Sequence, residues 1–296
     1  MNDGKKEKHR GTKHRIREEK KREQRIGLAL LVSIVIAIVC VSGFLIDSVL
    51  NQPSTGQTSG PVSESKAAVV DHLSCTAPNR TFIQTATNIL IKAGYTVDYY
   101  LGEKVTVEFY RKLPTQGYGL IILRVHSALV STEEPPVTLF TSEPYSKMKY
   151  VYEQLTDQLG WVTYRFENGT PTEPTYFGIS PLFVKQSMNG RFEDAIIVMM
   201  GCNGLTYADM AQAFIQKGAK AYISWSDAVV ASHTDQATIQ LLKHLVTENQ
   251  TIKQAVTETM KEVGPDEAYQ SQLGYYPFEV GDQTVEDITG KTTTNP

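Results

Sequence analysis

The chain has 296 residues, of which 41% are hydrophobic and 21% are charged, with a formal net charge of −3. This length allows one sizeable globular domain with attachments, but not comfortably two large domains. Its three cysteines, Cys40, Cys75 and Cys202, are too few for a disulfide-stapled scaffold.

The first 25 residues form a basic tail, with eleven Lys or Arg against five Asp or Glu. Residues 26–46, IGLALLVSIVIAIVCVSGFLI, then run for 21 residues without a charge. A helix of this length crosses a hydrocarbon core of about 30 Å, so we predict a transmembrane helix over 26–46. A cleaved signal peptide is the alternative, but its apolar region usually has about 7–15 residues and ends at a small-residue site.

The charge distribution predicts the orientation and the partners of the chain. By the positive-inside rule, residues 1–25 are a cytoplasmic tail and everything after residue 46 lies outside the cell, at the cell membrane. Beyond the tail, 18 basic and 27 acidic residues remain, so we expect no nucleic-acid partner. The N-glycosylation motifs at Asn79, Asn168 and Asn249 agree with an outside location, as weak support.

Residues 47–65 are polar with Pro and Gly, which predicts a flexible stalk. Short apolar runs then alternate with amphipathic segments. We expect strands at 67–73, 95–101, 119–125, 195–200 and 220–225, and helices at about 80–93, 206–217, 235–247 and 251–262. Strands that are apolar on both faces and alternate with helices indicate a parallel sheet covered on both sides.

Nearly seventy residues separate the third and fourth expected strands. This insert contains an expected helix with Met148, Tyr152, Leu155 and Leu159 on one face. So long an excursion in a compact α/β domain is usually functional or loosely ordered. We assign residues 66–285 to one α/β domain and residues 286–296 to a flexible C-terminal tail.

Two reactive side chains follow apolar strands. His126 comes directly after GLIILRV, and Cys202 comes one Gly after AIIVMM. Functional groups collect beyond the carboxyl ends of parallel strands, so His126 and Cys202 face one crevice if their strands are neighbours. A nearby imidazole and a following helix N-terminus both favour the thiolate. The alternative is an inert, buried cysteine.

The stretches LIILRVHSA and IIVMMGCNGLTYADMAQAFIQKGAKAYISWSDAV together resemble the caspase-like cysteine peptidases. This group includes caspases, clostripain, gingipains, separase and CHAT-type domains, and the likeness is closest to the CHAT and gingipain-like branch. It covers roughly residues 66 to 277. It implies a caspase-hemoglobinase-like three-layer α/β sandwich, with a mainly parallel sheet and helices on both faces, preceded here by one transmembrane helix.

The resemblance also implies roles for individual residues. His126 becomes the general acid and base and Cys202 the nucleophile, while the backbone N–H groups of Ser127 and Cys202 form the oxyanion hole. The loop after the fifth strand lines the substrate pocket in this family, which corresponds here to Trp225, Ser226 and Asp227. Asp227 suits a basic substrate side chain.

The sequence departs from the family at several points. It has His-Ser where the family usually has His-Gly, and His126 and Cys202 are 76 positions apart against about 50 in caspases. The long insert is therefore a lid, a specificity element or an autoinhibitory segment. Cys75, which follows the first strand, is a candidate redox partner of Cys202, with an incidental thiol as the alternative.

We therefore expect a membrane-anchored, outward-facing cysteine endopeptidase that cleaves a peptide or protein substrate through a thioester. No metal or other cofactor is expected. The alternative is a degenerate module of the same fold that binds a peptide or protein partner. A flavodoxin-like cofactor domain is disfavoured because SCTAPNRT, and not a Gly-rich phosphate loop, follows the first strand.

Overall fold

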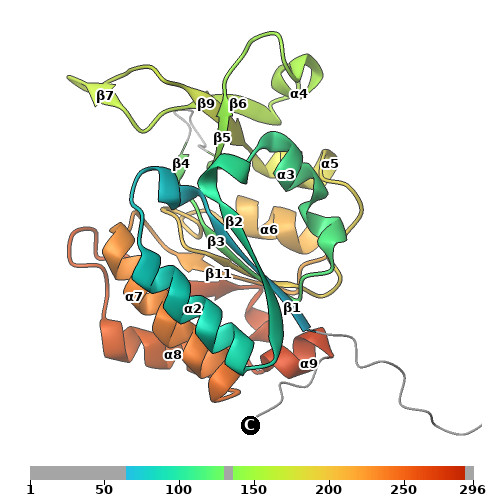
Figure 1. Cartoon of the computed structure of the whole chain (residues 1–296), viewed down its shortest axis with the longest axis vertical. Coiled ribbons are helices and arrows are strands. Elements are labelled where there is room, and N and C mark those ends of the chain that lie inside the picture. The colour runs from blue at the N-terminus through green and yellow to red at the C-terminus, as the bar shows by residue number, and fades with distance from the viewer. Residues whose placement is uncertain (1–64, 130–135, 291–296) are drawn as a thin grey trace, which may run out of the picture. The chain divides into compact units, whose positions relative to one another are not determined.

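The computed structural model describes residues 65–129 and 136–290 (Figure 1). The expected cytoplasmic tail at 1–25, the expected transmembrane helix at 26–46 and nearly all of the expected stalk lie outside the described residues. Among the helices that are described, none is long and apolar enough to cross a membrane.

A six-stranded sheet forms the centre of the domain, in the order β12-β11-β10-β3-β1-β2. Five strands are parallel, and β12 runs antiparallel to β11. The strands are β1 (Ser65–Asp71), β2 (Tyr95–Leu101), β3 (Leu120–Arg124), β10 (Ile196–Met199), β11 (Ala221–Trp225) and β12 (Leu273–Tyr276). All five expected strands are present, and the sheet gains an antiparallel edge strand that we did not predict.

Alternate side chains of the sheet enter two separate hydrophobic cores. Val69 and Ile122 belong to the core beneath α2 (Arg80–Lys92), α7 (Ala231–Leu242) and α8 (Ile252–Val263). Val70 and Ile121 belong to the core beneath α3 (Val107–Lys112), α5 (Pro181–Gln186) and α6 (Asp209–Gln216). Figure 1 shows helices on both sides of the sheet, so the predicted three-layer arrangement is confirmed.

The long insert folds into a second, antiparallel sheet that the sequence did not predict. Its order is β4-β5-β9-β6, and a two-stranded hairpin, β7-β8, projects from it. The strands are β4 (Ser127–Leu129), β5 (Val137–Pro144), β6 (Leu159–Val162), β7 (Phe166–Glu167), β8 (Thr170–Pro171) and β9 (Tyr176–Ile179). In Figure 1 this sheet stands above the end of the central sheet where β1 and β3 finish.

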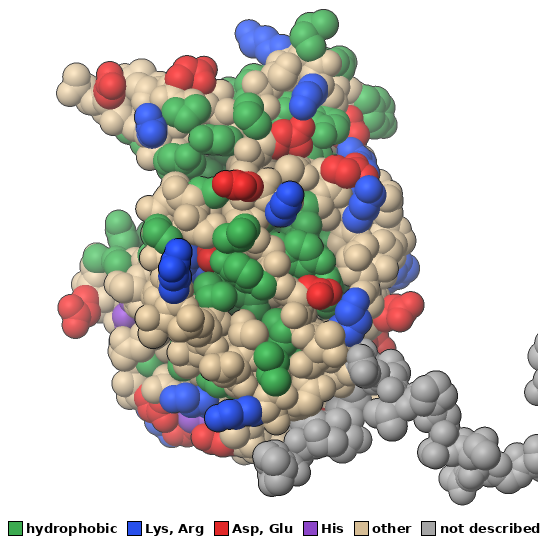
Figure 2. Space-filling view, in the orientation of Figure 1, with side chains coloured by type: hydrophobic (Ala, Val, Ile, Leu, Met, Phe, Trp, Pro, Cys, Tyr) green, Lys and Arg blue, Asp and Glu red, His purple; other side chains and the backbone are tan. Residues whose placement is uncertain are grey.

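The expected helix of the insert is shorter than predicted. It is α4 (Val151–Leu155), and Leu159 begins β6 instead of extending the helix. Met148 and Leu155 are 86% and 80% exposed. Figure 2 shows hydrophobic side chains exposed on this upper part of the molecule, among charges of both signs.

Two of the expected domain boundaries are wrong. Residues 286–289 are not a flexible tail, because α9 (Val285–Thr289) begins with a Thr284–Asp287 capping box and buries Val285 and Ile288. Residues 291–296 lie outside the described residues. Ser65, which we assigned to the stalk, is the first residue of β1. The helix at α7 begins at Ala231 and continues as a π-helical segment, Lys243–Thr247.

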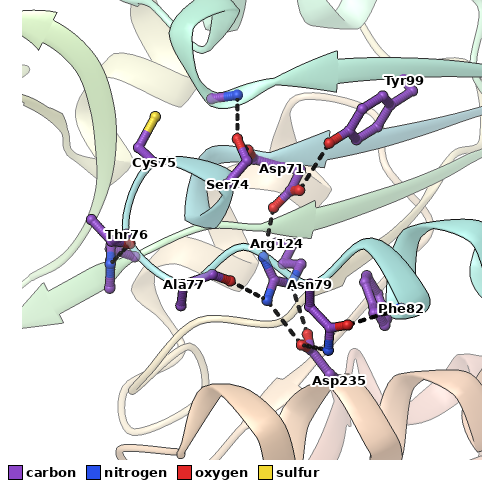
Figure 3. Close-up of polar contacts among 12 residues, drawn as sticks. Asp71, Ser74, Cys75, Thr76, Ala77, Asn79, Phe82, Tyr99, Arg124 and Asp235 are labelled. Atoms are coloured by element: carbon purple, nitrogen blue, oxygen red, sulfur yellow. Dashed lines mark hydrogen bonds and ion pairs between the residues drawn. The ribbon is translucent and has the colours of Figure 1, made fainter.

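A buried cation lies at the carboxyl end of β3 (Figure 3). Arg124 is 1% exposed, and its guanidinium pairs with Asp71 of β1 at 2.7 Å and with Asp235 of α7 at 2.7 Å. A second bond to Asp235, from Nη2, measures 2.8 Å, and Nη2 also donates to the carbonyl oxygen of Ala77 at 2.8 Å. The fork of Arg124 therefore joins β1, β3, α7 and the segment ahead of α2.

The two carboxylates of this network receive further donors. Tyr99 donates to Asp71 at 3.0 Å, and Asn79 donates to Asp235 at 2.8 Å while its side-chain oxygen caps α2. An ion pair removed from water is tolerated only when such bonds satisfy its remaining atoms. Because the amide of Asn79 belongs to this network, a glycan at that motif would disrupt it.

We predict that Arg124→Met destabilises the domain by about 3–5 kcal/mol, because two buried carboxylates lose their counter-ion. Urea unfolding followed by circular dichroism measures the change. Lys261→Met is the matched control, since the Lys261 side chain is 64% exposed and, within the described residues, forms an ion pair with Glu258 alone. The cost of this substitution stays below about 1 kcal/mol. Equal stability of the Arg124→Met variant and the wild-type protein contradicts the account.

Candidate active site

The strands that carry His126 and Cys202 are neighbours. β3 and β10 pair in parallel register, with Leu123 opposite Met199, and the N–H of Met200 donates to the carbonyl oxygen of Leu123 at 2.9 Å. His126 and Cys202 lie just past the ends of these strands. The structure therefore places both residues at one edge of the sheet, as expected from the sequence.

The turns after the two strands are in direct contact. The hydroxyl of Ser127 donates to the carbonyl oxygen of Cys202 at 2.6 Å. A Cβ atom at Gly201 would collide with that hydroxyl and with the carbonyl oxygen of Val125, so the glycine permits close approach of the turns. The positive φ of this turn belongs to Asn203, at 61°. Ser127 thus holds the cysteine turn.

The imidazole of His126 is held from several sides. Its Nε2 lies 2.8 Å from the hydroxyl oxygen of Thr76. Three rings surround it, with centroid distances of 5.7 Å to His72, 5.8 Å to Phe140 and 5.7 Å to the stacked Tyr164. Because Thr76 occupies Nε2, Nδ1 is the nitrogen left to exchange a proton with a thiol.

The sulfur of Cys202 contacts the backbone of Val229. It accepts the Val229 N–H at 3.5 Å, and the thiol donates to the Val229 carbonyl oxygen at 3.6 Å. Within the described part of the chain, no hydrogen bond joins this sulfur to the ring of His126. The structure therefore brings the two turns together, but the thiol and the imidazole are not bonded to each other.

Both groups favour their neutral forms. Burial raises the pKa of the Cys202 thiol, and the carboxylates of Asp266 and Asp227 raise it further, while the Val229 N–H opposes them. Burial lowers the pKa of His126, and the charge of Arg124 adds to that effect. The expected help from a following helix is not realised, because α6 begins only at Asp209.

The three residues expected to line a substrate pocket lie in different environments. Trp225 is 1% exposed, and its indole N–H donates to Thr234 of α7 at 2.8 Å, so its ring packs in the layer that α2, α7 and α8 form. Ser226 and Asp227 are exposed. The carbonyl oxygen of Asp227 accepts the N–H of Asn203 at 2.9 Å, which fixes this loop beside the cysteine turn.

The two cysteines of the candidate redox pair are not joined by a disulfide in this structure. Cys75 and Cys202 are both free thiols, with Cys75 exposed and Cys202 partly buried. The sulfur of Cys75 lies 3.9 Å from the hydroxyl oxygen of Ser142. Among the described residues, no group of three His, Cys, Asp or Glu side chains gathers to hold a metal ion.

Sequence reasoning missed two residues beside His126, namely His72 and Thr76. His72 is the first residue after β1 and is 1% exposed. Its Nδ1 has no hydrogen-bond partner among the described residues. Burial, with a contribution from His126, lowers its pKa to about 4. The rule that singled out His126, a polar residue after an apolar strand, applies equally to His72 in AAVVDHL.

No family model matches the chain, and no curated protein matches it. Among solved structures, the Drosophila initiator caspase Dronc is similar to this chain with a TM-score of 0.35 and 10% identity. The match covers 78% of this chain and 95% of the Dronc chain.

The depressed pKa of His72 predicts an acid sensitivity. His72 binds a proton near pH 6.5 in the unfolded chain but only near pH 4 in the folded chain. Folding stability therefore falls as the pH drops through this window. We expect His72→Phe to remove about 2–3 kcal/mol of that loss, because one pKa unit corresponds to about 1.4 kcal/mol. Urea titrations at pH 7, 5.5 and 4.5 measure it. Parallel pH profiles for both proteins contradict the assignment.

The two thiols differ in accessibility, which predicts an order of alkylation. Cys75 is exposed, whereas Cys202 is partly buried and its pKa is raised. Under native conditions at pH 7, iodoacetamide should modify Cys75 first, and the rate at Cys202 should keep rising with pH beyond 9. Mass spectrometry of tryptic peptides measures both rates. Faster modification of Cys202 at pH 7 contradicts the buried, neutral thiol described above.

Proposed function

We propose that this protein is a cysteine endopeptidase of the caspase-like class, with Cys202 as nucleophile and His126 as acid and base. One observation carries the proposal. His126 and Cys202 follow adjacent parallel strands, and the Ser127–Cys202 hydrogen bond ties their turns together. A Cys/His dyad requires a thiol as nucleophile and an imidazole as base, and here they come from facing turns.

The proposed reaction uses these groups in order. Nδ1 of His126 takes the thiol proton, and the thiolate attacks the carbonyl carbon of the scissile peptide bond. The resulting oxyanion is stabilised by the backbone N–H groups of Cys202 and Ser127. The C–N bond then breaks, and His126 returns the proton to the departing amine. Water, activated by His126, hydrolyses the thioester and releases Cys202.

The reaction needs a conformational step, because the thiol rests on Val229 and not on His126. Catalytic hydrogen bonds are often loose before substrate binds. The same observation favours a second candidate, a degenerate module that binds a peptide or protein partner. In that case Cys202 is a packed thiol that performs no covalent chemistry.

The proposal includes a location and a substrate class. Residues 26–46 anchor the protein in the cell membrane, residues 1–25 stay in the cytoplasm, and the α/β domain faces outward. The support is the uncharged run of 21 residues and the basic tail ahead of it. Peptides or proteins outside the cell are the proposed substrates, with Ser226 and Asp227 beside the bond to be cleaved.

Alanine at Cys202 should abolish cleavage of a peptide library by the full-length protein in detergent, because no other group in the proposed mechanism forms the thioester. Fragment masses before and after incubation measure cleavage. Cys75→Ala is the matched control and should retain activity, since the exposed thiol of Cys75 plays no part in the mechanism. Cleavage that survives in the Cys202→Ala variant rules the mechanism out, and absence of cleavage in both proteins favours the binding module.

A further inference from the structure

The long insert contacts the imidazole of His126 through an aromatic side chain. Tyr164 comes two residues after β6, and its ring stacks on the imidazole with a centroid distance of 5.7 Å and an interplanar angle of 24°. Of the three rings that surround His126 within the described residues, this is the one nearly parallel to it. The planes of His72 and Phe140 are inclined to the imidazole by 82° and 48°. Tyr164 therefore covers one face of the imidazole.

The ring of Tyr164 is itself held in place by a second tyrosine. It stacks on Tyr176 with a centroid distance of 5.4 Å and an interplanar angle of 17°, and the two hydroxyl groups are hydrogen-bonded at 2.9 Å. Tyr176 is the first residue of β9 and lies opposite Val162 of β6. The sheet of the insert thus fixes the ring that rests on the imidazole.

The backbone beside Tyr164 is fixed at the base of the β7-β8 hairpin. Thr163 is 6% exposed. Its hydroxyl donates to the carbonyl oxygen of Thr172 at 2.9 Å and accepts the N–H of Arg165 at 3.0 Å. The N–H of Thr172 in turn donates to the carbonyl oxygen of Arg165 at 3.0 Å. These bonds close the base of the hairpin and hold the segment on either side of Tyr164.

Two restraints of different kinds then define the orientation of the imidazole. Rotation about the Cβ–Cγ bond of a histidine has broad energy wells, and a half-turn exchanges Nδ1 with Cδ2. The hydrogen bond between Nε2 and Thr76, at 2.8 Å, selects one of the two half-turn states. The ring of Tyr164 restricts the plane, because an imidazole that rotates out of this plane loses the stacking contact. The position of Nδ1, the proposed base, therefore depends on a residue of the insert.

We propose that Tyr164 is a positioning residue for His126, and that the insert thereby forms part of the active site. This inference rests on the proposed function, in which Nδ1 of His126 takes the thiol proton, and it extends that function to the insert. Proton transfer is efficient only when the base is held close to its productive geometry. Tyr164 acts by holding the imidazole, and it neither gives nor takes a proton in the proposed reaction.

Two substitutions separate the ring of Tyr164 from its hydroxyl. Tyr164→Phe keeps the ring that stacks on the imidazole, and Tyr164→Leu removes it. With the full-length protein in detergent and a peptide that the wild type cleaves, we expect Tyr164→Leu to lower kcat about tenfold or more while KM changes less than about twofold. Tyr164→Phe should retain most of kcat. Tyr152→Leu, the same change at a tyrosine of α4 that is 69% exposed, is the matched control and should behave as the wild type.

Nuclear magnetic resonance gives a readout that needs no peptide cleavage. The chain contains six histidines, and full-length protein labelled with ¹³C at histidine Cε1 gives a ring signal for each. The signal of His126 is assigned by its loss in His126→Asn. We expect this signal to change little in Tyr164→Phe. In Tyr164→Leu it should move toward the random-coil shift and show a more mobile ring by relaxation. His244, whose ring contacts Glu248 and Glu262, is the internal control.

Three results overturn the proposal: wild-type kcat in Tyr164→Leu, an unchanged His126 signal in that variant, or equal loss of kcat in Tyr164→Phe and Tyr164→Leu. The His244 signal reports whether Tyr164→Leu is folded. If it is not, Tyr164→Met, which fills the space with a flexible chain, is the second variant without the ring, and the same outcomes apply to it.

The two proposals fail separately. If cleavage survives in Cys202→Ala, or if the wild type cleaves no peptide, the endopeptidase assignment fails, and the His126 signal still decides whether Tyr164 orients the imidazole. If cleavage depends on Cys202 while Tyr164→Leu keeps wild-type kcat and an unchanged His126 signal, the peptidase stands and the role of Tyr164 fails.

Discussion

The ion pairs of the buried Arg124 guanidinium are the interaction on which the end of the domain around His126 and Cys202 depends. It lies between the carboxylates of Asp71 and Asp235, and so joins β1, β3 and α7 at one point. Removing one partner from such a cluster leaves an uncompensated buried charge, so the three residues are stable only together. The cluster also fixes the position of the residues around His126. Arg124 is two residues before His126, and its bond to the carbonyl oxygen of Ala77 fixes the segment that carries Thr76.

A second constraint is the close contact of the turns after β3 and β10. Gly201 has no room for a side chain, and the Ser127 hydroxyl bonds the backbone of Cys202 in the space this leaves. The backbone of the site is thereby preorganised. The reacting atoms are not, since the thiol rests on Val229 and the imidazole on Thr76. The backbone of the two turns is thus fixed, while the thiol and the imidazole are bonded to other groups and, within the described residues, not to each other.

The central sheet was predictable because its strands are apolar on both faces and alternate with amphipathic helices, and β2 has the predicted boundaries. Parallel pairing then brought His126 and Cys202 to one edge. The insert was not predictable, since its short strands pair across long sequence separations and carry no sustained periodicity. The buried ion pairs of Arg124 were not predicted, because Arg124 lies inside an apolar run and its partners come from distant segments. Trp225 was wrongly expected in the substrate pocket. Side chains alternate along a strand, so Trp225 points to the same face of the sheet as Ile223, toward α2, α7 and α8.

The central claim is that Cys202 is a nucleophile served by His126, and covalent labelling by a substrate-like electrophile tests it most directly. The full-length protein is treated with a peptidyl acyloxymethyl ketone, and the modified residue is identified by mass spectrometry. The account predicts an adduct on the sulfur of Cys202 that is lost in the His126→Ala variant. An adduct on Cys75 alone, or labelling of Cys202 that is unchanged without His126, would contradict it.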